Sequence, residues 1–128
     1  MIKMLGDKDA AANIAVKNLE TAKKFYEDTL GLTQTDAEGQ EVIVFKSGHS
    51  TVNVYRSQYA GTNQATAVTW MVGEDMESVV QQLKVKGIIF EHYDMPGVTR
   101  EGDVHIAGDM KVAWFKDPDG NILNIASR

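Results

Sequence analysis

A short string at residues 90–97 (FEHYDMPG) carries the densest group of side chains able to exchange protons. Glu91, His92, Tyr93 and Asp94 follow one another there, and imidazole and phenol groups can act as acid or base. We therefore take His92 and Tyr93 as the catalytic candidates. The other interpretation is an acidic, solvated strand end, because charged side chains are mostly exposed.

The segment that follows, at about residues 93–109, is rich in glycine and includes the turn-forming pair Pro96-Gly97. This composition fits a lid or rim that closes over a ligand. Arg100 on that segment would then pair with an acidic group of the ligand.

Histidine is the usual metal ligand, and the chain contains three histidines. His92 and His105 flank the glycine-rich segment and could approach each other, but no carboxylate stands at a spacing that completes a metal site. His49 falls in a predicted hairpin turn, where exposure is the default. We expect no metal ion and no other cofactor.

Composition narrows the classes of function. The 128 residues include no cysteine, which excludes thiol catalysis and zinc-thiolate sites. The formal charge of −5 disfavours a nucleic-acid partner. Neither a leader peptide nor a membrane-spanning run is evident, so we expect a cytoplasmic protein with no membrane partner.

An internal repeat predicts how the chain positions these groups. A shift of 56 residues places Val16 on Val72 and Gly31 on Gly87. We therefore expect a single domain over residues 1–128 that consists of two modules, at about residues 10–57 and 65–128. The segment at 93–109 is then an insertion that the first module lacks.

The first module has the order β-α-β-β-β. A strand at residues 12–16 precedes a helix at 19–30, with Asn18 as its N-cap and Gly31 in the left-handed conformation that ends it. Residues 42–45 and 52–55 alternate as the two strands of a hairpin.

The second module repeats this order after a linker at residues 58–64. A strand at 68–72, a helix from Met76 to Gly87 and a strand at 88–90 precede the closing hairpin. The turn of that hairpin is Asp117-Pro118-Asp119-Gly120, in which Pro fixes φ and Gly supplies a positive φ.

Two such modules resemble the vicinal oxygen chelate superfamily, which includes glyoxalase I, extradiol dioxygenases and the fosfomycin- and bleomycin-resistance proteins. The strings that carry the resemblance are 16–20 (VKNLE), 25–32 (FYEDTLGL) and 115–121 (FKDPDGN). The resemblance implies an α+β fold of two βαβββ modules, with a curved mixed sheet around a cleft and the helices outside.

The resemblance also implies one divalent metal ion, held by side chains of the first and last strand of each module. Those four positions fall here on Ala11, Asn53, Ala67 and Asn124. Two methyl groups cannot bind a metal, and two neutral amides supply neither the charge nor the number of donors that such sites use. The metal chemistry of the superfamily is therefore not expected in this chain.

Side chains two apart on a strand share a face, which predicts what else lines the cleft. On this argument Trp114 points into the cleft if Phe115 packs under a helix. The alternative is that Trp114 belongs to the core or to a dimer interface. The predicted ligand-binding residues are Asn13, Thr51, Asn53, Tyr55, Thr69, Met71, Arg100, Trp114 and Asn124.

Three functions stay open at this point. The first is a metal-independent protein that binds a small organic ligand in the cleft. The second is a glyoxalase-like isomerase or lyase, which uses either a metal or acid and base groups such as His92 and Tyr93. The third is a dimeric scaffold with no active cleft; in each case a homodimer is expected, because exposed strand edges favour pairing.

Overall fold

The computed structural model describes residues 4–127. The chain divides into two compact units, Met1–Gln58 and Tyr59–Arg128. The α+β fold class expected from the sequence is confirmed, with one mixed sheet in each unit. In the part of the chain described, no helix is long and apolar enough to cross a bilayer.

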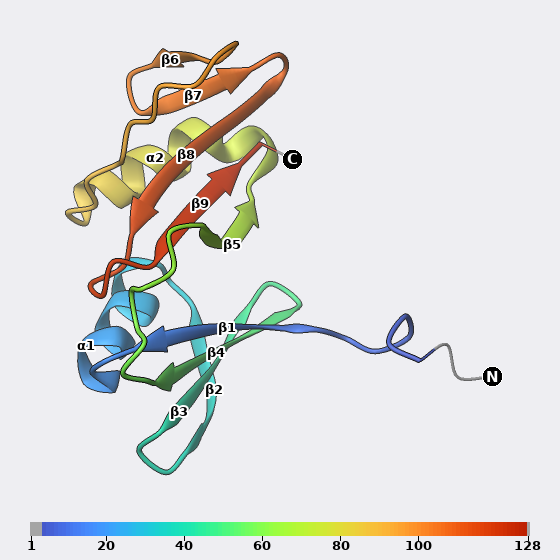
Figure 1. Ribbon diagram of the computed structural model, residues 1–128, viewed down its shortest axis with the longest axis vertical. Helices are drawn as coiled ribbons and strands as arrows, with labels where there is room; N and C mark the ends of the chain where they lie inside the picture. The colour runs from blue at the N-terminus through green and yellow to red at the C-terminus, as the bar shows by residue number, and fades with distance from the viewer. Residues whose placement is uncertain (1–3, 128) are drawn as a thin grey trace. The chain divides into compact units, whose positions relative to one another are not determined.

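The first unit contains a four-stranded sheet in the order β1-β4-β3-β2 (Figure 1). Its first strand pairs in parallel with its last, and the remaining pairs are antiparallel. The elements are β1 (Ala11–Val16), α1 (Leu19–Lys23), the π-helical stretch η1 (Lys24–Thr29), β2 (Thr33–Glu38), β3 (Val42–Ser47) and β4 (Ser50–Arg56).

The predicted helix is confirmed, with a local change of hydrogen-bond register in its second half. The Asn18 Oδ1 atom accepts from the Thr21 amide at 3.0 Å, so Asn18 is the N-cap. From Lys24 onward the helix is π-helical. Gly31 ends it with φ of 81°.

One face of the first sheet packs on this helix. Tyr26 and Phe45 are fully buried there, with ring centroids 6.2 Å apart. Because neighbours along a strand point to opposite faces, burial of Ile14 and Val54 places Asn13 and Asn53 on the other face. That second face is called the open face below.

The second unit contains a five-stranded sheet in the order β5-β9-β8-β7-β6 (Figure 1). Its first strand again pairs in parallel with its last. The elements are β5 (Thr66–Met71), the short 3-10 helix η2 (Gly73–Asp75), α2 (Met76–Val85), β6 (Thr99–Glu101), β7 (Val104–Ala107), β8 (Met110–Lys116) and β9 (Ile122–Ala126).

The hairpin between β8 and β9 has the predicted turn. Gly120 has φ of 90°, and the Asp117 Oδ1 atom accepts from the amides of Asp119 at 3.0 Å and Asn121 at 2.8 Å. Phe115 and Leu123 are buried on the helix side of this sheet. Trp114 therefore lies on the open face of the second unit.

The prediction of a strand at residues 88–90 was wrong. A single bridge joins Glu91 to Trp114, and the segment is anchored instead by Phe90, which is buried with its ring centroid 5.8 Å from that of Phe115. The segment at 93–109 contains two strands, β6 and β7, joined by a turn at Gly102, which has φ of 62°. The strand beside β8 is therefore β7.

Replacing Phe45 by Ala should lower the free energy of unfolding by about 3–5 kcal/mol, because the buried ring leaves a cavity against Tyr26. Replacing Ile89, which is 83% exposed, by Ala is the control and should change it by less than about 0.5 kcal/mol. Urea denaturation followed by circular dichroism measures both. Equal losses in the two variants would contradict this core.

Candidate functional site

The open face of the first unit brings two amides together. In the parallel register of β1 and β4, Asn13 stands beside Asn53, and in the antiparallel register of β3 and β4, Val44 stands beside Asn53. The Asn53 Nδ2 atom donates to the Asn13 Oδ1 atom at 3.3 Å. The two amides are thus partners on adjacent strands.

These amides line a shallow pocket of about 560 Å³, a size that fits a small ligand. Tyr55, whose side chain is partly exposed, forms part of the lining with two valines. The lining residues are Asn13, Val42, Val44, Asn53 and Tyr55. Val42 and Val44 were missed from the sequence, although their alternation with Ile43 and Phe45 carried the signal.

Thr51 shares the face of Asn53 but lies outside this pocket. It is exposed and stands in register with Ala11 on one side and Lys46 on the other. The structure therefore brings together three of the four ligand-binding residues predicted in the first unit.

In the second unit, the three residues in register across β5, β9 and β8 are Thr69, Asn124 and Trp114, and they form the row that corresponds to Asn13, Asn53 and Val44. The Trp114 indole N–H donates to the Thr66 Oγ1 atom at 3.1 Å. Because β9 lies between β8 and β5, the indole must extend across β9 to reach Thr66. Met71, also predicted as a ligand contact, is 63% exposed further along β5.

Asn124 is buried in this row, in contrast to Asn53 in the first unit. It is 8% exposed, and its Oδ1 atom is buried with no hydrogen-bond partner among residues 4–127. The position of Val44 in the first unit is occupied by Trp114 in the second. A larger side chain thus stands beside the buried amide of the second unit than beside the amide of the first.

Trp114 also belongs to an aromatic cluster with Tyr93 and His105. Its ring centroid lies 4.9 Å from that of His105 and 5.3 Å from that of Tyr93, both edge-to-face. The Tyr93 backbone amide donates to the His105 Nε2 atom at 2.9 Å. A neutral His105 therefore carries its proton on Nδ1, which is buried without a partner in the described part of the chain.

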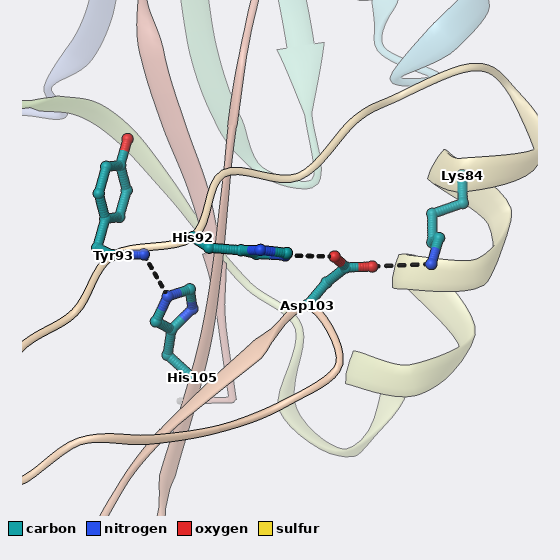
Figure 2. A network of polar contacts seen from close by, with 5 residues as sticks. All are labelled: Lys84, His92, Tyr93, Asp103 and His105. Carbon is teal, nitrogen blue, oxygen red and sulfur yellow. Dashed lines mark hydrogen bonds and ion pairs between the residues drawn. The ribbon is translucent and has the colours of Figure 1, made fainter.

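His92 belongs to a separate polar network. Figure 2 shows Asp103 between His92 and Lys84, with the Tyr93 ring directed away from them. The Asp103 Oδ1 atom lies 2.7 Å from His92 Nε2, and Oδ2 lies 2.8 Å from Lys84 Nζ. Lys84 first and His92 second, through these hydrogen bonds, lower the pKa of Asp103 below its ordinary value.

The structure therefore separates the two catalytic candidates, because His92 contacts Asp103 and Tyr93 packs against Trp114. The imidazoles of His92 and His105 do approach each other, with ring centroids 6.4 Å apart, yet they bond to different partners. Arg100 is exposed on β6, in register with His105. His49 is exposed in the β3–β4 turn, as expected.

Asp103 and Lys84 were missed from the sequence. They stand on the β6–β7 turn and on α2, and no spacing along the chain relates them to His92. The Gly102-Asp103 pair carried a turn signal, but the partners of Asp103 come from tertiary structure.

The residues present do not fit the metal ion that the fold implies. Ala11 and Ala67 offer methyl groups, and Asn53 and Asn124 offer one neutral amide each. Ala67 also lies at a register shift between Thr66 and Val68. Within residues 4–127, no three His, Asp or Glu side chains gather closely enough to hold a metal ion.

A second concave region of about 520 Å³ lies at the start of α1. Side chains of both charge signs line it, and one of them, Arg56, is paired with Glu41 at 3.7 Å. Mixed, exposed charges of this kind are typical of a solvated surface. We therefore place the candidate site on the open faces of the sheets.

Replacing Asp103 by Asn should lower the free energy of unfolding at neutral pH by about 1 kcal/mol, because Lys84 and His92 lose a charged partner. The pKa of Asp103 is lowered by folding, so its contribution is complete above the unfolded value of about 4 and is lost as the pH falls through the lower folded value. Denaturation at several pH values should show the difference between the two proteins begin to shrink as the pH falls below about 4. A constant difference across that range, or the same loss in the exposed control Asp94→Asn, would contradict the network.

The comparisons with known proteins agree with this architecture. The profile of the Glyoxalase/Bleomycin resistance protein/Dioxygenase superfamily matches residues 10–125. No curated protein sequence gives a significant match.

Solved structures show the same fold at low sequence identity. A glyoxalase family protein from Enterococcus faecalis has a TM-score of 0.73 at 20% identity, over 96% of this chain and 99% of that one. Lactoylglutathione lyase from Agrobacterium tumefaciens has 0.70 at 14%, over 94% and 92%. The fosfomycin resistance protein FosX from Listeria monocytogenes has 0.66 at 12%, over 100% and 93%.

Both the arrangement of strands and the match over most of the chain lead to the same assignment. The chain belongs to the Glyoxalase/Bleomycin resistance protein/Dioxygenase superfamily.

Proposed function

We propose that this protein binds a small organic molecule on the open face of its first unit and needs no metal ion to do so. The observation that carries the proposal is the pocket in which Asn13, Asn53 and Tyr55 meet over an apolar floor. A few polar groups set among apolar and aromatic side chains are the usual composition of a small-molecule site.

Two further features support this function. The four positions at which the fold would hold a metal carry no charged donor, so we expect the ligand to contact the protein directly and not through a metal ion. The relatives include a fosfomycin resistance protein and a lactoylglutathione lyase, and the names of both refer to small organic molecules. The cleft between the two modules, the homodimer and the cytoplasmic location stay predictions from the sequence.

Replacing Tyr55 by Ala should weaken the binding of a flat aromatic probe, quinoline, by about threefold to tenfold, because the probe loses its stacking partner. Replacing Tyr59, a tyrosine that is 68% exposed and outside the pocket, by Ala is the matched control and should leave the affinity unchanged. Titration of the amide resonances of β1, β3 and β4 by nuclear magnetic resonance measures the Kd. Shifts confined to other elements, or equal losses in both variants, would contradict the proposal.

A second candidate function is acid and base catalysis at His92. The observation that favours it is the 2.7 Å contact between Asp103 Oδ1 and His92 Nε2. A carboxylate that holds one ring nitrogen fixes the imidazole and leaves Nδ1 to exchange a proton with a substrate. His92 is partly exposed, so a substrate could reach it. Tyr93, the other candidate, packs its ring on Trp114.

If His92 acts as a general base, the protein treated with a chelator should speed the replacement of the carbon-bound protons of hydroxyacetone by deuterium from deuterium oxide. Replacing His92 by Gln should then slow the exchange about 100-fold, which is typical of a lost general base. His49→Gln is the control, because His49 is an exposed histidine in another turn. Proton resonance intensities follow the reaction. Absence of exchange above the rate in buffer, or an equal effect of the two variants, would refute this function.

A further inference from the structure

We infer that the amide pair of the first unit selects a ligand that carries an N–H group beside a carbonyl in a flat ring, as lactams do. The inference rests on the proposed function, because it names the ligand class of the same pocket. Four observations carry it: the direction of the bond between the amides, the lining of the pocket, its lack of charge, and the matching row of the second unit.

The direction of the hydrogen bond fixes what each amide can still offer. An Asn side chain has one carbonyl acceptor and two N–H donors. Asn53 donates through Nδ2 to the Asn13 Oδ1 atom. The Asn53 carbonyl oxygen and the Asn13 amino group make no other hydrogen bond within residues 4–127. The pair therefore presents the side-chain carbonyl of Asn53 as an acceptor, together with two N–H donors of Asn13 and one of Asn53.

A ligand that supplies both a donor and an acceptor can satisfy the remaining groups of both asparagines. The N–H of a lactam can donate to the Asn53 Oδ1 atom while its carbonyl accepts from the Asn13 Nδ2 atom. A ligand that lacks the N–H removes water from Asn53 without replacing the hydrogen bond, and this desolvation lowers its affinity. Selection thus arises from the cost of an unpaired amide.

The remaining lining favours a flat and neutral ring. Val42 and Val44 supply apolar contacts, and the Tyr55 ring supplies a stacking surface. No side chain with a formal charge lines this pocket. A charged ligand would therefore lose hydration without gaining a partner of opposite charge.

The corresponding face of the second unit holds a flat ring of this kind. Trp114 stands at the position of Val44, and its indole extends across β9 beside Asn124. The indole is flat and carries an N–H that is hydrogen-bonded to Thr66. In the first unit the smaller Val44 leaves the equivalent surface to a ligand.

The test compares three probes that differ at one edge: carbostyril, N-methylcarbostyril and quinoline. Carbostyril has both groups, its N-methyl derivative lacks the donor, and quinoline lacks the donor and the carbonyl. The full-length protein should bind carbostyril at least about tenfold more tightly than either of the others. The side-chain amide resonances of Asn13 and Asn53 report the binding directly.

The variants Asn53→Leu and Asn13→Leu should each reduce this preference to near unity while quinoline still binds. Asn63→Leu is the matched control, because Asn63 is an exposed asparagine in the loop before β5, and it should keep the preference. The milder Asn13→Ala replaces Asn13→Leu if the latter does not fold, as judged by circular dichroism.

The outcomes separate this inference from the proposed function. Equal binding of the three probes, or a preference that survives both asparagine variants, would overturn the inference and leave the proposed function standing. If none of the probes, quinoline included, shifts the resonances of β1, β3 and β4, both would be overturned.

Discussion

In each unit the first strand pairs in parallel with the last, and the register of that pairing decides which side chains reach the core and which reach the open face. Asn13 stands beside Asn53 in the first unit, and Thr69 stands beside Asn124 in the second. A slip of β1 by one residue would turn Ile14 outward and bury Asn13. Burial of Ile14 and Val54 under the helix therefore holds the amide pair in place, and the site depends on the core directly behind it.

The open faces of the two units differ, although both contain the same parallel pairing of first and last strand. An asparagine stands at the centre of both rows, but its neighbour on the next strand is Val44 in one unit and Trp114 in the other. In the second unit the indole, Tyr93 and His105 pack together, so aromatic side chains of the protein occupy the face. In the first unit the amides line a pocket. The face of the second unit is thus occupied by its own aromatic side chains, and the proposed ligand site lies on the first unit alone.

Local signals in the sequence predicted the fold well. Asn18 as the helix cap, Gly31 as the helix end and the turn from Asp117 to Gly120 each depend on residues close in the chain, and all three are confirmed. The β6–β7 hairpin was missed because a strand as short as Thr99–Glu101 has too few residues to show an alternation. The contacts of Asp103 with Lys84 and His92 were missed because they join separate elements, and the indole of Trp114 could be assigned a face but not a path across β9.

The central claim is that a neutral amide pair, rather than a metal ion, serves as the binding group of this member of the superfamily. The most direct measurement is the metal content per chain of protein purified without a chelator, by elemental mass spectrometry, together with the melting temperature after addition of nickel, zinc, iron or manganese. A ligand that binds the folded state must raise that temperature. The account predicts far less than one ion per chain and no rise. A near-stoichiometric metal ion together with a clear rise would contradict it.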